Sequence, residues 1–213
     1  MDILLLAMAW LLYFALHSVL ASNAVKQYAE HRYPQAMPFY RLFYNAMALG
    51  TLVPIIYLMV INPGQAFWVW PAEWFWIKAT VVTAALTCFI WSLRYYDLKA
   101  FMGLNSRSQI KPDAETISRL IISPIHRFVR HPWYSCALFI LWFRDMNTAQ
   151  FVSTLIISAY FIVGTRLEEG KLIKEFGGHY ERYQQKVPAL IPLPWKFLSK
   201  KEALALSAQM NEA

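Results

Sequence analysis

Residues that could carry chemistry gather in three short clusters of the sequence. The first cluster is Arg130-His131-Pro132-Trp133-Tyr134. Proline suits the first turn of a helix, where a missing N–H costs nothing, so this cluster is expected to open a helix. The exposed N–H groups of such a helix start can bind an anionic group. His131 and Tyr134, three residues apart, would share one helix face. A helix start with a basic flank and an interfacial tyrosine explains the same residues without any chemistry.

The second cluster is the acidic pair Glu168-Glu169, which directly follows an apolar run. A carboxylate in this place could bind the ammonium group or the ribose hydroxyls of a nucleotide-like ligand. The alternative is a solvated pair that interacts with Lys171 and Lys174. The third cluster runs from Phe176 through Gly177, Gly178 and His179 to Tyr180 and on to Val187-Pro188. Without a functional role, this cluster would be a helix that ends or bends at Gly177 and packs its aromatic side chains on the bilayer.

The elements that must position these clusters are membrane helices. Hydrophobic residues make up 58% of the 213-residue chain, whereas soluble domains are about 45–50% apolar. A helix that crosses the bilayer needs about 20 mostly apolar residues. The sequence predicts an all-α integral membrane bundle of about five transmembrane helices, the last two a tight hairpin, with amphipathic helices on the cytoplasmic side. The predicted spans are 3–21, 39–61, 74–93, 131–146 and 149–166, in one domain over residues 1–198 that is followed by a flexible tail, 199–213.

The basic residues predict the orientation of the bundle. The net charge is +7, and Lys and Arg concentrate in alternate gaps between the apolar runs, as the positive-inside rule requires. We therefore expect a protein of the bacterial inner membrane with its N-terminus outside, its C-terminus in the cytoplasm and the lipid bilayer as a partner. This placement argues against nucleic acid as the partner. Cys88 and Cys136 lie inside apolar runs and form no metal-binding pattern, so no metal site is expected.

The combined motif resembles a known superfamily. The chain is similar to the isoprenylcysteine carboxyl methyltransferase and phospholipid methyltransferase superfamily, which includes bacterial methanethiol S-methyltransferases. The similarity lies in the motif RHPxY, one hydrophobic hairpin arm after it, and then the motif EExxLxxxFGxxYxxYxxxVPxxxP. The second pattern is filled here at Glu168, Glu169, Leu172, Phe176, Gly177, Tyr180, Tyr183, Val187, Pro188 and Pro192. The resemblance implies a methyltransferase that takes S-adenosylmethionine (SAM) from the cytosol. Its acceptor would be a small thiol or a lipid-like molecule at the cytoplasmic membrane face.

The resemblance also implies roles for single residues. His131, Tyr134 and Glu168 would contact the cofactor, and Arg130 would act in catalysis by orienting the site or the anionic end of the acceptor. Further residues would lie along the cofactor, namely Ser118, Arg119, Leu120, Ile121 and His126. The chain departs from the family at two positions, because Cys136 stands where glycine is frequent and His126 stands where tyrosine is usual.

Two other functions remain open from the sequence. His17-Ser18 and the stretch Tyr40-Arg41-Leu42-x-Tyr44-Asn45 resemble NnrU-like proteins and the related ζ-carotene isomerase, which uses haem. A histidine within the membrane is a functional candidate, although His17 could equally be a polar residue at a helix end. The remaining alternative is a non-catalytic membrane assembly factor, which would need neither SAM nor haem.

Overall fold

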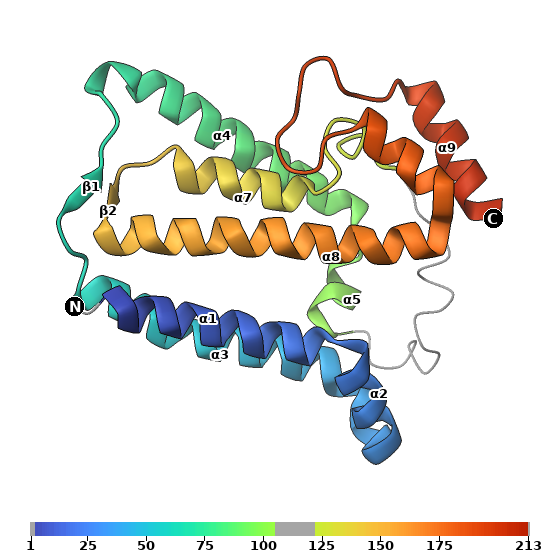
Figure 1. Ribbon diagram of the computed structural model, residues 1–213, viewed down its shortest axis with the longest axis horizontal. Coiled ribbons are helices and arrows are strands. Elements are labelled where there is room, and N and C mark those ends of the chain that lie inside the picture. The colour runs from blue at the N-terminus through green and yellow to red at the C-terminus, as the bar shows by residue number, and fades with distance from the viewer. Residues whose placement is uncertain (1–2, 105–121, 213) are drawn as a thin grey trace. The chain divides into compact units, whose positions relative to one another are not determined.

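The described residues of the computed structural model, 3–104 and 122–212, are helical almost throughout (Figure 1). The α-helices are α1 (Ile3–Ala21), α2 (Asn23–Arg32), α3 (Tyr40–Ile61), α4 (Phe75–Ser92), α5 (Leu98–Met102), α7 (Pro132–Trp142), α8 (Thr148–Lys186) and α9 (Lys200–Glu212). Short 3₁₀ helices are η1 (Pro34–Phe39), η2 (Ala72–Trp74) and η3 (Leu93–Tyr95). The predicted all-α class is confirmed.

Within residues 3–104 and 122–212, four helical stretches are long and apolar enough to cross a membrane. They are Ile3–Ala21, Pro34–Ile61, Ala72–Tyr95 and Thr148–Lys186. A helix of 19 residues such as α1 is about 28 Å long at 1.5 Å per residue, close to the hydrocarbon thickness of about 30 Å. These stretches contain the predicted spans 3–21, 39–61, 74–93 and 149–166, so the chain is an integral membrane protein by the length and composition of its helices.

The remaining predicted span, 131–146, is helical over a shorter range. Helix α7 has 11 residues, which gives about 16 Å. The residue after it, Phe143, leaves the helical region with φ −92° and ψ 38°, and Met146–Asn147 is already a strand, β2. The helix ends at Trp142 because the polar residues Arg144 and Asp145 make a turn directly after it. Asp145 accepts a hydrogen bond from the backbone N–H of Trp70, at 3.0 Å.

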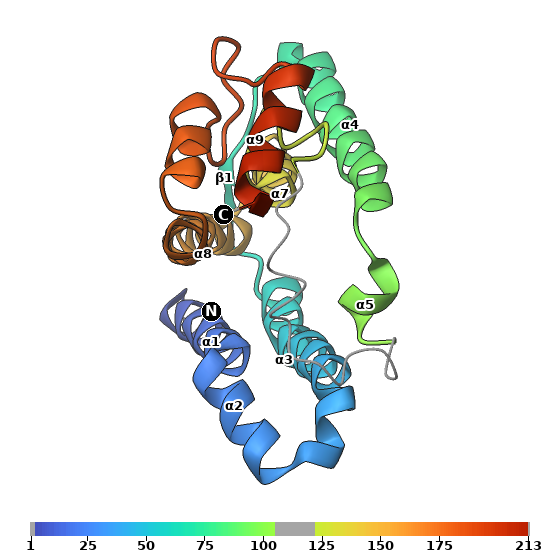
Figure 2. The same cartoon turned by 90° about the vertical axis from the view of Figure 1, so that its right-hand side faces the viewer.

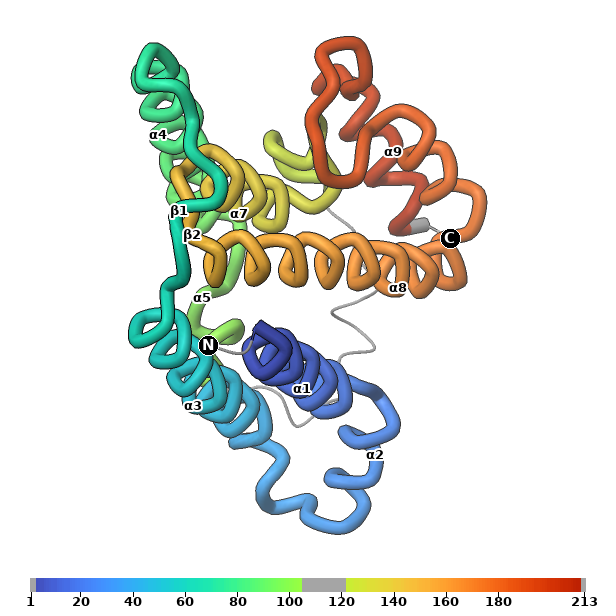
Figure 3. Tube along the Cα trace, turned by 60° about the vertical axis from the view of Figure 1, so that its left-hand side comes forward, coloured from blue at the N-terminus to red at the C-terminus, as the bar shows by residue number. Residues whose placement is uncertain are grey.

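The described residues group into two compact units, each with its own contacts. The first unit comprises residues 3–72, 96–104 and 144–157. In this unit α1 runs along α3 (Figure 3), and the buried residues Leu6, Trp10, Ile55 and Ala149 form its core. Strand β2 pairs antiparallel with β1 (Ala66–Trp68). The apolar runs of the sequence do not predict this small two-stranded sheet.

The second unit comprises residues 73–95, 122–143 and 158–212. Helices α4 and α7 lie side by side in it (Figure 2). Trp133 at the start of α7 donates its indole N–H to Ser92 Oγ at 2.8 Å. Trp142 at the end of α7 donates to Ser158 Oγ of α8 at 3.1 Å. Helix α7 is therefore held at both ends, which fixes the position of the Arg130–Tyr134 cluster that opens it.

Gly177 reverses the direction of the chain near the end of α8. Its φ of +53° and ψ of −136° are accessible to glycine but costly for residues with a Cβ atom. Figure 1 shows the chain turning sharply at this end of α8 and running back. The reversal brings Gln184 to Glu169, with 2.8 Å between Nε2 and Oε2. The predicted bend at Gly177 is therefore present.

The last described residues fold into α9, whereas the sequence predicts a flexible tail over 199–213. Ala203, Leu206 and Met210 are buried because they recur at the spacing of one helix face. They pack in a cluster with Tyr180 and Tyr183 of α8. A capping box starts α9, since the backbone N–H of Ser199 donates to the Glu202 carboxylate and the N–H of Glu202 donates to Ser199 Oγ. This pattern, Ser-x-x-Glu before an amphipathic run, is the signal that the prediction missed.

The two neighbouring glycines at the reversal provide a matched test. Neither Gly177 nor Gly178 has an atom within 4 Å of a Cβ built on it, but only Gly177 has a positive φ. We expect Gly177→Ala to lower the free energy of unfolding by about 1–3 kcal/mol because of backbone strain alone. Gly178→Ala should leave it unchanged or raise it, since alanine favours helix. Thermal unfolding in detergent measures both, and equal effects of the two substitutions would contradict the strain argument.

Candidate functional site

The first cluster is fixed by the chain that follows the reversal at Gly177. The backbone N–H of Arg130 donates to the carbonyl of Pro188 at 2.9 Å, and that of His131 donates to Ala189 at 3.0 Å. Ser135 Oγ donates to the carbonyl of Leu190. The chain after α8 thus pairs with the residues just before α7. This pairing places the Arg130 and His131 side chains against the α8 segment that carries the acidic pair.

A buried ion pair forms the centre of the site. Arg130 Nε lies 2.6 Å from Glu169 Oε1 and Nη2 lies 2.9 Å from Oε2, so the contact is bidentate. The side chains are 8% and 9% exposed. The remaining guanidinium nitrogen, Nη1, donates to the carbonyls of Gln184 and Val187. Each guanidinium nitrogen of Arg130 therefore has a partner within the protein, and these contacts join the start of α7 to the end of α8.

His131 lies between the two acidic residues. Its Nε2 is 3.0 Å from Glu169 Oε1 and its Nδ1 is 3.7 Å from Glu168 Oε2. Because an ionised carboxylate only accepts hydrogen bonds, Nε2 donates to Glu169, and this bond fixes the orientation of the ring. The separation from Glu168 is too long for a direct hydrogen bond. A ligand N–H or O–H group placed beside both atoms could interact with each of them.

A cavity of about 100 Å³ opens beside this group. Its lining residues are Ile122, His126, Arg130, His131, Glu168, Leu172, Tyr180 and Tyr183. Glu168 contributes a carboxylate that is 53% exposed, in contrast to the buried Glu169. The cavity thus combines an accessible acid and an oriented imidazole with an apolar wall. The predicted residues Arg130, His131, His126 and Glu168 come together here.

Tyr134 contacts the site through its ring, which packs against His131. Its ring stacks on that of His131, with centroids 5.7 Å apart and an angle of 6° between the planes. On its other face it stacks on Phe161 of α8 at 4.5 Å. The three rings form a column between α7 and α8, and Tyr134 is outside the set of cavity-lining residues. A direct contact between Tyr134 and a cofactor stays a prediction.

His126 is held in a neutral state at the edge of the cavity. Its Nδ1 lies 2.7 Å from Ser123 Oγ, and its carbonyl accepts a hydrogen bond from the Tyr183 hydroxyl at 2.6 Å. Burial, and in second place the neighbouring His131, lower the pKa of His126 to about 4. At neutral pH His126 therefore adds no positive charge to the cavity.

Some predicted site residues cannot be placed, and other residues at the site were not predicted. Ser118, Arg119, Leu120 and Ile121 lie outside the described residues. The family motif predicts a cofactor contact for the first acid of the pair, Glu168, and no role for Glu169. Gln184, Tyr180 and Tyr183 reach the site only because the chain reverses at Gly177, which a linear motif does not reveal. A helical face through Glu168 and Leu172, four residues apart, could have identified Leu172.

The histidine of the haem alternative has a different environment. His17 Nε2 lies 2.5 Å from the Tyr44 hydroxyl in the first unit. The cavity beside this pair has a volume of about 10 Å³, which is room for about one water molecule. This geometry does not support haem binding at His17.

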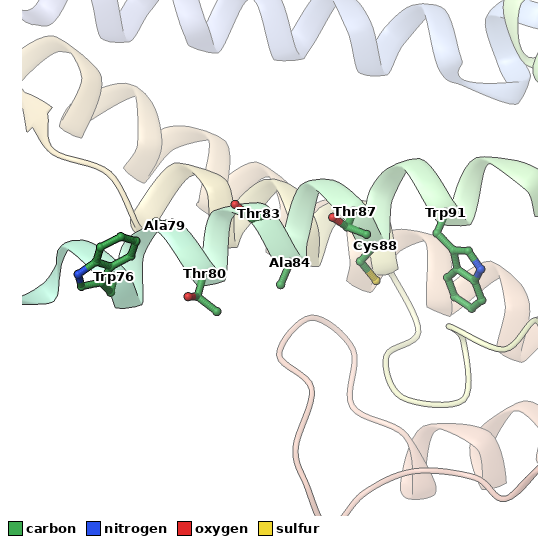
Figure 4. A pocket seen from close by; sticks show the side chains of 8 residues that line it. All are labelled: Trp76, Ala79, Thr80, Thr83, Ala84, Thr87, Cys88 and Trp91. Carbon is green, nitrogen blue, oxygen red and sulfur yellow. The ribbon is translucent and has the colours of Figure 1, made fainter.

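A larger hollow follows one face of α4 (Figure 4). It measures about 680 Å³ and is lined by Trp76, Ala79, Thr80, Thr83, Ala84, Thr87, Cys88 and Trp91. These side chains lie along the helix, and none is a carboxylate, an imidazole or a basic group. The hollow therefore offers apolar surface rather than the groups that bind a charged cofactor, and the smaller cavity at His131 is the better candidate for chemistry.

Comparison with known proteins finds a relative that matches most of the chain. It is 26% identical over 208 residues to the methanethiol S-methyltransferase of Pseudomonas deceptionensis, a match that covers 90% of this chain and 71% of the relative. No family model and no solved structure matches the chain.

Matches over shorter ranges have a higher sequence identity. The protein-S-isoprenylcysteine O-methyltransferase of Schizosaccharomyces pombe is 39% identical over 80 residues, and the methanethiol S-methyltransferase 1 of Bradyrhizobium diazoefficiens is 38% identical over 69 residues. These matches cover 35% and 32% of this chain, but only 33% and 24% of the respective relatives. The relatives agree in being named methyltransferases, and they differ in the acceptor that their names give.

Removing one partner of the buried ion pair should be strongly destabilising. Glu169→Gln leaves Arg130 buried without its counter-charge, and such a loss costs about 3–5 kcal/mol. The control is Lys186→Gln, which breaks the exposed pair between Lys186 and Glu202 (2.6 Å) and should change stability little, since exposed pairs contribute little. Thermal unfolding of both variants in detergent measures the difference. A Glu169→Gln protein as stable as the Lys186→Gln protein would contradict the central role of the ion pair.

His126 should make the protein labile to acid. Its folded-state pKa of about 4 lies below the value of about 6.5 in an unfolded chain, so the unfolded state binds the proton first. The contribution of His126 to stability is therefore complete above about pH 6.5 and is lost as the pH falls to about 4, by about 3 kcal/mol in all. We expect His126→Asn to flatten the dependence of unfolding temperature on pH in this window. An unchanged slope would show that other groups cause the acid lability.

Proposed function

As a member of the isoprenylcysteine methyltransferase-like family, this chain is, we propose, an integral membrane methyltransferase that uses SAM as methyl donor. The observation that carries this proposal is the cavity at the start of α7, where His131 and Glu168 face a common space. The names of the relatives support methyltransferase activity. The acceptor we propose is a small thiol or a lipid-like molecule. The relative matched along most of this chain, which is named for methanethiol, favours a thiol.

The charge of the described cavity suits a cationic ligand. Arg130 and Glu169 neutralise each other in their ion pair, and neutral His126 adds nothing. The carboxylate of Glu168 then leaves the described lining with an excess of negative charge. The sulfonium and ammonium groups of SAM outweigh its carboxylate, so its net positive charge complements this lining. An anionic ligand would instead meet a carboxylate at the entrance.

The size of the described cavity limits what it can hold. Pockets for whole ligands are typically about 300–1,000 Å³, and this cavity is about 100 Å³. We propose that it holds one end of SAM, with the ammonium or the ribose hydroxyls placed between His131 Nδ1 and the Glu168 carboxylate. The predicted cofactor contacts Ser118 to Ile121 belong to the segment directly before the lining residue Ile122.

The residues of this chain would act mainly by alignment. When bound, SAM supplies a methyl carbon on a positively charged sulfur, and its transfer is an in-line displacement that depends on positioning. Glu168 would hold the cationic end. Glu169 would orient His131, and Arg130 would keep Glu169 in place. Leu172 and Tyr180 give the cavity an apolar wall beside the Glu168 carboxylate. Arg130 is thus proposed as a positioning residue, because its guanidinium is already engaged within the protein.

The orientation in the membrane is a further part of this proposal. We propose that the start of α7 and the chain after Thr165 lie at the cytoplasmic face of a bacterial inner membrane, with the N-terminus outside. SAM would then reach the cavity from the cytosol, and an apolar acceptor would reach it from the bilayer. The basic residues that follow α8, such as Lys196 and Lys200, agree with the positive-inside rule.

Binding of radiolabelled SAM to the purified protein in detergent tests the proposal. Glu168→Gln should weaken binding by about 10- to 100-fold, because a charge-assisted hydrogen bond contributes about 1.5–3 kcal/mol. It should leave the unfolding temperature unchanged, since the Glu168 side chain is half exposed. Glu175→Gln, at an exposed acid on the same helix, is the control and should bind SAM normally. Equal affinity of the two variants would refute the assigned role of Glu168, and no binding by the unaltered protein would refute the function.

A further inference from the structure

The chain that follows α8 carries an exposed apolar surface that the proposed site does not use. Ile191, Trp195 and Phe197 are 62%, 74% and 49% exposed. Phe128 is 47% exposed, and its ring stacks on that of Phe197 with centroids 5.8 Å apart. We call these four residues the interfacial patch. Exposed apolar side chains concentrated in one part of the chain point to a site of interaction with a protein or a membrane.

The interfacial patch is built on a fixed backbone. Arg127 and Leu198 exchange two hydrogen bonds: the N–H of Leu198 donates to the Arg127 carbonyl at 3.0 Å, and Arg127 Nε donates to the Leu198 carbonyl at 2.8 Å. The Leu198 side chain is 1% exposed and anchors the segment in the core. The neighbouring side chains Phe128 and Phe197 therefore point outward from a defined surface.

The patch also lies next to the end of an apolar helix. The chain that leads into it is bonded to the start of α7 through Pro188, Ala189 and Leu190. Since α7 is an apolar helix that begins at Pro132, we place the surface of the membrane-embedded part of the second unit at this end. A surface attached to that end is continuous with the part of the protein that faces lipid.

The basic residues around the patch determine which surface it fits. Lys196 lies between Trp195 and Phe197, and Lys200 and Lys201 follow shortly after; all three lysines are exposed. Tryptophan and lysine side by side are typical of the membrane–water interface, where the ring sits among the headgroups and the ammonium binds lipid phosphates. A protein partner would need acidic groups to match these lysines, whereas an anionic leaflet provides such groups over its whole surface.

We infer that the interfacial patch inserts into the headgroup region of the cytoplasmic leaflet, with Lys196, Lys200 and Lys201 binding anionic phospholipids. The segment is thus a second membrane contact, separate from the membrane-spanning helices. It anchors the chain whose carbonyls hold Arg130 and His131. The inference does not depend on methyl transfer, because it concerns the surface of the segment and not the cavity.

A fluorescent reporter on the full-length protein in lipid nanodiscs tests the inference. Trp195→Cys in a Cys88→Ala/Cys136→Ala background is labelled with an environment-sensitive dye. The control is Gln185→Cys, at an exposed polar position of α8. With phosphatidylglycerol in the bilayer, the dye at position 195 should be quenched by lipids carrying a nitroxide near the headgroup and shielded severalfold from iodide. The dye at position 185 should remain open to iodide.

Replacing the three lysines by glutamine distinguishes the contribution of their charge to membrane contact from the contribution of the apolar side chains. In nanodiscs with phosphatidylglycerol, this variant should lose part of the shielding, towards the value in phosphatidylcholine alone. Equal iodide quenching at positions 195 and 185 would overturn the inference. Shielding from iodide without quenching by lipid nitroxides would also overturn it, because the patch would then be covered by protein. Shielding that is unaffected by the lysine substitutions would overturn the assignment to anionic lipid.

Discussion

The site depends on one buried interaction, the bidentate pair of Arg130 and Glu169. Burying two charges costs solvation energy, which only good geometry and further hydrogen bonds can offset. Those further bonds come from His131, Gln184 and the carbonyl of Val187. The pair therefore links three parts of the chain that are distant in sequence: the entry to α7, the middle of α8 and the segment after the reversal. It specifies one arrangement of these parts, in which His131 is oriented and Glu168 is left accessible.

Most of the fold could be predicted from the sequence, because helices in lipid need a long apolar run and no distant partner. This is why the ranges of α1, α3, α4 and the first part of α8 follow from composition. The prediction fails where tertiary contacts decide the outcome. Helix α7 ends at Trp142, where the following turn is held by the hydrogen bond from Trp70 to Asp145. Helix α9 forms because its apolar face packs against Tyr180 and Tyr183.

The candidate site was predicted in part for a similar reason. His131 and Glu168 belong to motifs that can be read along the chain, and both line the cavity. The sequence cannot predict which acid of the pair is buried and which is accessible, since Glu168 and Glu169 are chemically identical and adjacent. Only the path of the chain, which returns after Gly177, determines that Glu169 points to the interior. The same chain path pairs Arg130 with Glu169, so the Arg130 guanidinium supports the structure and is not available as a free cation.

The packing of α9 has a practical consequence for anyone who handles the protein. Ala203, Leu206 and Met210 share one packed cluster with Ile122, Tyr180 and Tyr183, which also line the cavity. The final helix thus packs directly against residues that form the wall of this cavity. A purification tag or a fusion partner joined directly behind Met210, or proteolytic trimming that reaches this residue, will loosen that wall. Such an alteration would weaken ligand affinity without touching a residue that contacts the ligand.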